Sequence, residues 1–139
     1  MADLAYNFFK QKMLDTAYDL SSLNVKAMLV RIGAGHYVVT QATDQFVSVI
    51  AGGDQIAISP QLTVVSITNG IFGAGPTVFA AVPAGPAAGA VVLFVDTGVQ
   101  ATSPLICYLD TYSGLPITPS GSDINLVFLT TGNKIFALV

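Results

Sequence analysis

From residue 52 onward, hydrophobic and polar positions form short apolar runs that are separated by turn residues. The runs are rich in Val, Ile, Thr and Phe, and Gly, Pro, Asn and Asp lie between them. Such runs are typical of β-strands. Together with an earlier run at 25–31, they predict strands over 55–59, 62–68, 71–72, 77–82, 90–95, 105–111, 124–129 and 134–138. Short strands at this spacing predict a mainly β fold, either a β-sandwich or a jelly-roll-like barrel.

Specific turn signals divide these strands. Asn69-Gly70 predicts a tight hairpin, because both residues tolerate a positive φ. The sequences Asp-Thr-Gly at 96–98 and Thr-Gly-Asn at 131–133 resemble turns. Residues 113–123 are polar and contain two prolines, which predicts a stiffened loop.

The segment of residues 36–51, between the run at 25–31 and the strands after residue 52, is ambiguous. Its first part, 36–40, favours a strand. Its second part could instead be a helical turn that Thr43 caps, with Phe46, Val49 and Ile50 on one face.

A short helix is predicted near the N-terminus, over residues 4–14. Apolar side chains that include Phe8, Phe9 and Met13 recur at roughly helical spacing, and Asp3 can cap the start. A helix this short is marginal alone, so it must dock its aromatic side chains. Its own sheet is the default site, and a partner subunit is the alternative. Phe8 and Phe9 point about 100° apart on a helix, so each could serve one of these roles.

The length of 139 residues predicts one domain. Within it, we expect a helical docking segment over 1–20 and a β body over 24–139.

Residues 78–95 are wholly apolar and reach the minimum length for crossing a membrane. Pro83 and Pro86 would break a helix at its centre, and no basic cluster flanks the segment. We therefore expect a strand, a turn and a strand, over 78–82, 83–89 and 90–95, and no membrane association.

Charge is scarce along the whole chain. Only 9% of the residues are charged, against about 25% in a typical soluble domain, and 53% are hydrophobic. No charged residue lies between Asp54 and Asp96. So long a neutral stretch cannot all be core in so small a domain. The chain is therefore predicted to be a subunit of a larger assembly that covers part of its surface, with homo-oligomers expected. The weak net charge of −3 argues against nucleic-acid binding.

Residues that commonly carry chemistry are few. His36 is the single histidine, and the single cysteine, Cys107, lies in an apolar run that predicts burial. No phosphate-binding loop, nucleophile elbow or set of metal ligands is visible. We predict no catalytic residues, no metal site and no cofactor. His36 is expected to make ordinary hydrogen bonds at a turn or strand end.

Three segments, in order, resemble one known family. They are AYNFFKQKMLDTAYDLSSLNVKAMLV at the start, AVVLFVDTGVQATSPLICYLDTY in the second half, and ITPSGSDINLVFLTTGNKIFALV at the end. Together they are similar to small structural proteins of tailed bacteriophages that resemble capsid decoration, or cement, proteins. The resemblance covers roughly residues 5–31 and 90–139. It implies a β-sandwich-like body, clustering on a capsid surface and no enzymatic activity.

The expected function is therefore a decoration protein that binds the outer surface of the major capsid protein shell and stabilises the head. A homotrimer is favoured, since capsid lattices offer threefold positions. The protein would be made in the host cytoplasm, because no secretory signal is visible, and would end on the virion. A tail or head-fibre subunit is one alternative, and a non-catalytic ligand- or glycan-binding module is another. The candidate interface residues are Phe8, Phe9, Met13, Val78, Phe79, Val82, Pro83 and Pro86.

Overall fold

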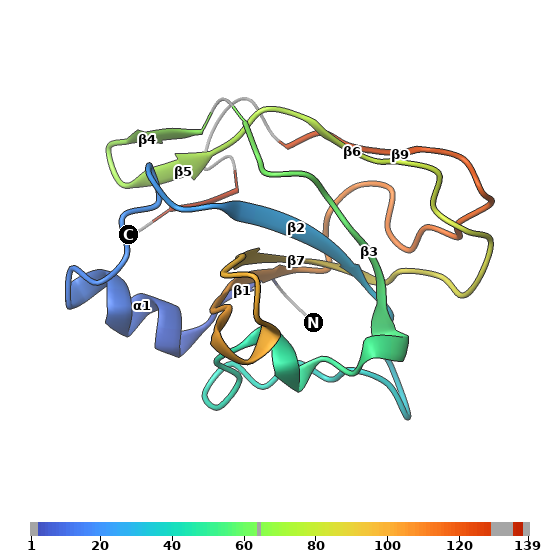
Figure 1. Cartoon of the computed structure of the whole chain (residues 1–139), viewed down its shortest axis with the longest axis horizontal. Helices are drawn as coiled ribbons and strands as arrows, with labels where there is room; N and C mark the ends of the chain where they lie inside the picture. The colour runs from blue at the N-terminus through green and yellow to red at the C-terminus, as the bar shows by residue number, and fades with distance from the viewer. Residues whose placement is uncertain (1–2, 64, 129–134, 138–139) are drawn as a thin grey trace.

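The computed structural model describes residues 3–63, 65–128 and 135–137, and its largest element is a five-stranded antiparallel sheet (Figure 1). The strand order is β1 (Leu4–Ala5), β8 (Leu105–Leu109), β7 (Ala90–Val95), β2 (Val25–Val30) and β3 (Gln55–Ile58). Every residue of β7 and β8 is buried, and in β2 only Lys26 is not. Both faces of this sheet are therefore covered, which explains why its central strands are continuous apolar runs in the sequence.

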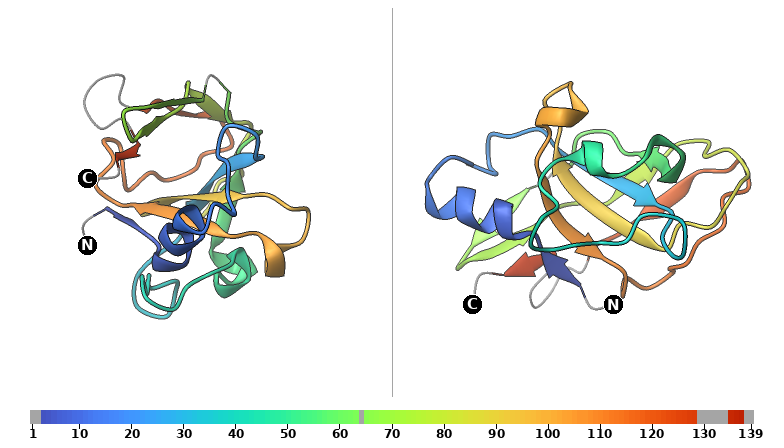
Figure 2. Two further views of the ribbon diagram at one scale, coloured as in Figure 1. Left: turned by 90° about the vertical axis from the view of Figure 1, so that its left-hand side faces the viewer. Right: turned by 90° about the horizontal axis from the view of Figure 1, so that it is seen from below.

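A second layer of short strands covers one face of the sheet (Figures 1 and 2). It contains a three-stranded sheet ordered β10 (Phe136–Ala137), β5 (Ile71–Gly73) and β4 (Ser66–Thr68), and a pair formed by β6 (Thr77–Phe79) and β9 (Ile124–Leu126). We call β4, β5, β6, β9 and β10 the outer layer. Burial alternates along β6 and β9, as expected for strands with one face turned to solvent.

The opposite face of the five-stranded sheet is covered by α1 (Asn7–Leu14) and by the segment 31–54 (Figure 2). This segment contains two short 3₁₀ helices, η1 (Val47–Val49) and η2 (Gly52–Asp54), and a third, η3 (Gln100–Thr102), lies between β7 and β8. The ring of Tyr37 in this segment lies 6.4 Å from the ring of Tyr108 on β8. The core is thus divided between the two faces of one sheet.

The predicted mainly β fold with one short N-terminal helix is confirmed. The strand over 90–95 has the predicted bounds, and the other described strands lie within predicted ranges apart from small shifts at their ends and the unpredicted β1. Asn69 and Gly70 have φ values of 53° and 74° and join β4 to β5, as the hairpin signal predicts. The predicted turn at 131–133 lies outside the described residues.

The start of the helix was predicted wrongly. Leu4 and Ala5 are extended and pair with Tyr108 and Cys107 of β8, so α1 begins only at Asn7. Asp3 does not cap this helix. Its carboxylate instead accepts hydrogen bonds from the backbone N–H groups of Asp110 and Thr111, at 2.9 and 3.0 Å, and from the Thr111 hydroxyl.

Two other segments differ from the sequence-based expectation. Residues 36–40 form no strand, although Tyr37 makes an isolated bridge with Ile32. The helical turn is a 3₁₀ helix over Val47–Val49 without a side-chain cap, so Thr43 has no capping role there. Val49 is exposed rather than packed with Ile50 on a buried face.

The apolar stretch 78–95 is a strand, a turn and a strand, as predicted. β6 pairs with β9 in the outer layer, whereas β7 pairs with β2 and β8 in the five-stranded sheet, so the connection crosses between the layers. Within the described part of the chain, no helix has the length and apolar character that crossing a membrane requires.

Candidate interaction surface

The solvent-facing side of the outer layer carries no charged residue on four of its strands. Charged side chains are absent from β4, β5, β6 and β9, and the exposed positions of these strands are Ile67, Thr68, Val78 and Asn125. Val78 and Asn125 are a cross-strand pair, and Val78 is 40% exposed. We call this side of β4, β5, β6 and β9 the neutral face. Strand pairing fixes its backbone hydrogen bonds, and partners can cover these strands without dehydrating a charge.

The predicted interface residues on and after β6 divide into two groups. Val78, Pro83 and Pro86 are exposed. Phe79 and Val82 are buried in the protein's own core, so they are not available to a partner in this fold. The run 78–82 is apolar throughout, so its sequence contains no alternation that separates inward from outward positions.

The aromatic side chains of α1 also divide. Phe9 is fully buried and stacks on Tyr18 with 6.3 Å between ring centroids, so its interface assignment is replaced by a core role. Phe8 is half-buried and packs its ring edge-on against Phe46 at 5.2 Å, with Lys12 above it. The helix is therefore docked on its own chain, the default of the two predicted arrangements.

An apolar groove lies between the end of α1 and the β4–β5 hairpin. It encloses about 220 Å³, and Met13, Tyr18, Leu20, Ile67 and Phe72 are among its lining residues. Ile67 is 51% exposed although it is a large apolar residue. The sequence analysis identified Met13 as an interface residue but did not identify the β4–β5 side of the groove. The sequence feature that could have indicated this side is the pair Ile67 and Ile71, which flank an uncharged turn.

Buried polar groups on the other face of the sheet are paired with one another. The Tyr6 hydroxyl lies 2.8 Å from the Tyr37 hydroxyl, which donates to the carboxylate of Asp44 at 2.7 Å. Asp44 also accepts a hydrogen bond from the Thr40 N–H at 2.8 Å. Burial raises the pKa of both phenols well above the ordinary value. The cluster fixes the segment 37–44 against β1 and offers no free nucleophile.

His36 makes ordinary hydrogen bonds at a turn, as predicted. Its ring Nδ1 lies 2.9 Å from a carboxylate oxygen of Asp54, and its backbone N–H donates to the Gly33 carbonyl. The backbone carbonyl of Asp54 accepts from the N–H of Arg31. These contacts join the turn at 33–36 to η2, which is a structural role.

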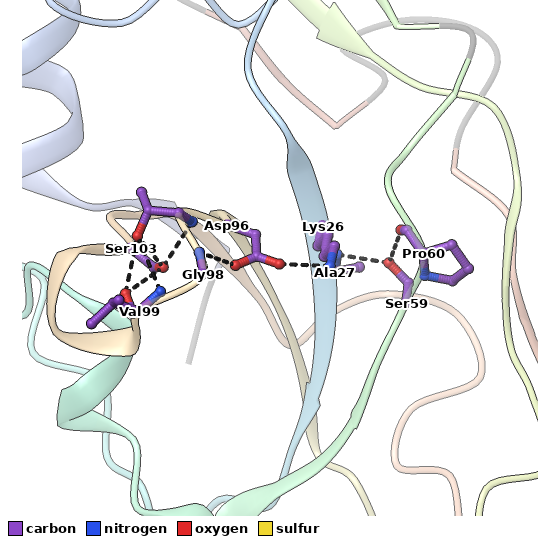
Figure 3. Close-up of polar contacts among 9 residues, drawn as sticks. Lys26, Ala27, Ser59, Pro60, Asp96, Gly98, Val99 and Ser103 are labelled. Atoms are coloured by element: carbon purple, nitrogen blue, oxygen red, sulfur yellow. Dashed lines mark hydrogen bonds and ion pairs between the residues drawn. The ribbon is translucent and has the colours of Figure 1, made fainter.

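The charged pair at the end of the sheet is also structural (Figure 3). Lys26 Nζ lies 2.6 Å from a carboxylate oxygen of Asp96, and the other oxygen accepts from the Gly98 N–H at 2.8 Å. These hydrogen bonds lower the pKa of Asp96. The Ser103 hydroxyl donates to the Val99 carbonyl and closes the same turn.

Neither a reactive thiol nor a metal centre is apparent in the described part of the chain. Cys107 is buried as predicted, and burial raises the pKa of its thiol. Among the described residues, no group of three His, Cys, Asp or Glu side chains could hold a metal ion.

No protein-family model matches this chain, and no curated protein matches it significantly. The resemblance to phage decoration proteins therefore stays a prediction from the three segments that carry it.

Proposed function

We propose that the chain is a bacteriophage capsid decoration protein that binds the outer surface of the major capsid protein shell and stabilises the head. The observation that carries the proposal is the neutral face, which presents exposed uncharged side chains on a layer of paired strands. The segments that resemble the phage family provide independent support. The active form in this proposal is a homo-oligomer, with a trimer favoured.

The physical reason is the cost of covering charge. Removing a charged group from water costs several kcal/mol unless it is well paired, so a neutral surface is cheap to bury. An oligomer that touches several shell subunits gains avidity without any strong single contact. Such contacts add to the barrier against shell rupture and need no catalysis.

Binding to purified heads tests the proposal. Heads that lack this chain should bind the added purified protein in cosedimentation and should then release DNA at a higher temperature. Val78→Asp places a charge on the neutral face and should weaken binding. Val38→Asp is the matched control, because Val38 is 63% exposed in the segment on the other side of the sheet.

Three outcomes would contradict the proposal. One is failure of the wild-type protein to bind heads. Another is equal loss of binding in both variants while both remain folded. The third is that particles lacking this chain keep normal thermal resistance but cannot attach to cells, which would support the tail or head-fibre alternative.

A further inference from the structure

Among the described residues, two sheets end in strands that come from one stretch of the sequence. β3 is the last strand of the five-stranded sheet, and β4 is the last strand of the three-stranded sheet. Both strands come from the sequence stretch 55–68, which contains no charged residue. An edge strand presents unpaired N–H and C=O groups to any extended chain, and soluble proteins usually guard such edges with charges, prolines or very short strands.

The opposite edge of the five-stranded sheet is guarded. β1 contains only Leu4 and Ala5, and α1 begins two residues after it ends. Asp3 precedes it and is held by Asp110 and Thr111. A strand that approached this edge would meet a charge at one end and a helix at the other.

The β3 edge has fewer guards. Its four residues are Gln55, Ile56, Ala57 and Ile58, and the only proline nearby, Pro60, comes after the strand has ended. Ile58 is 45% exposed. The Ser59 N–H bonds the Ala27 carbonyl of β2, so strand alternation points the N–H of Ile58 away from β2.

The charged side chain of the neighbouring strand β2 is paired on the side away from β3. Lys26 of β2 forms its ion pair with Asp96, which follows β7, and β7 and β3 flank β2 on opposite sides (Figure 3). The amide groups of Gln55 and Gln100 bond each other, with nitrogen-to-oxygen distances of 3.2 and 3.0 Å. The strand itself therefore offers backbone groups and uncharged side chains, and the carboxylate that directly precedes it, Asp54, is buried and bonded to His36.

We propose that β3 pairs with β3 of a second copy of this chain, antiparallel and about a two-fold axis, which joins two five-stranded sheets into one. Antiparallel edges are self-complementary under a two-fold rotation, since each donor meets the acceptor of its symmetry mate. Two copies with net charge −3 repel weakly, and the neutral edge is where they can approach without placing like charges opposite each other. The contact does not rest on capsid binding, and it could link neighbouring oligomers.

Sedimentation over a range of concentrations tests the contact. The wild type should associate, and Ile58→Lys should raise the dissociation constant by about tenfold or more, because each copy brings a charge to the shared edge. Ile58→Pro removes the outward N–H together with the isoleucine side chain and fixes φ, and it should also weaken association. Val38→Lys, an exposed valine away from the edge, should associate like the wild type.

A distance measurement identifies the interface itself. Ile58→Cys provides a single accessible thiol for a spin label, because Cys107 is buried. Four residues of strand span roughly 14 Å and paired strands lie about 5 Å apart, so two labels should fall within about 25 Å of each other. A wild type that stays monomeric, or an oligomer that is insensitive to Ile58→Lys and shows only longer distances, would overturn the proposal.

The same samples separate this proposal from the decoration function. A protein that associates through β3 but does not bind heads contradicts the decoration function alone. A protein that binds heads but shows no β3 contact contradicts this inference alone.

Discussion

The side chain of Ile32 lies directly over Gly89, so a Cβ atom at residue 89 would stand only 2.5 Å from Ile32 Cγ1. Gly89 also donates its N–H to the Val30 carbonyl at 3.0 Å, so its backbone cannot easily retreat. The connection from β6 to β7 thus enters the five-stranded sheet beneath a side chain that would have to move to admit another carbon.

Gly89→Ala should therefore destabilise the protein by about 1–3 kcal/mol, the usual cost of overpacking. Ile32→Ala removes the opposing atoms, so the same substitution should cost less in that background. Gly85→Ala is the matched control, since its nearest neighbouring atom is 3.9 Å away. Denaturant unfolding measures the free energy of the three single variants and of the double variant at residues 32 and 89. Equal costs of Gly85→Ala and Gly89→Ala would show that Ile32 does not limit the space at residue 89.

The two adjacent phenylalanines of α1 should differ in their effects. Phe9→Ala should cost roughly 3–5 kcal/mol in unfolding free energy, because Phe9 is fully buried. Phe8→Ala should cost clearly less, because Phe8 is half-buried against Phe46. Thermal melting of both variants provides the test. If Phe8→Ala is the more damaging change, the orientation of the helix is wrong.

The strand 90–95 and the Asn69-Gly70 hairpin could be predicted because their signals are local. The start of α1 could not, since Leu4 and Ala5 are extended only because β8, about 100 residues later, supplies a pairing edge. Local sequence permits either conformation there.

The candidate interface was predictable only in part, for a similar reason. Its neutrality is a sequence property and was recognised, and Val78 is exposed as an interface residue must be. The exclusion of Phe79 depends on which side of β6 faces the five-stranded sheet, and Val82 is buried in the connection that follows β6. That information lies in the pairing with β9 and was absent from the apolar run itself.

Alkaline pH should destabilise the protein through its buried tyrosines. Burial raises the pKa of Tyr6 and Tyr37 above the unfolded value near 10, and raises that of Tyr108 to about 12. The folded state then holds more protons than the unfolded state above pH 10, so stability is full below that pH and falls as pH rises.

Tyrosine absorbance during a pH titration checks this sign. The buried phenols should ionise only as the protein unfolds, and Tyr6→Phe should remove one of these late-ionising groups. Early ionisation of all five tyrosines in the folded protein would contradict the buried hydrogen-bonded cluster.

Cys107 should be inert in the folded protein. Its side chain is buried on β8, and burial raises the pKa of the thiol, so little thiolate forms and reagents cannot reach it. A thiol-reactive dye should label the native protein slowly and the denatured protein at once. Rapid stoichiometric labelling under native conditions would mean that β8 is exposed.

Image reconstruction of purified virions tests the central claim most directly. We predict density for this chain on the outer surface of the head, with the neutral face of β4, β5, β6 and β9 against the major capsid protein. Particles from a strain that lacks the chain should show intact shells without that density. Density for this chain in the tail or a fibre, or head density in which the neutral face points to solvent, would contradict the account.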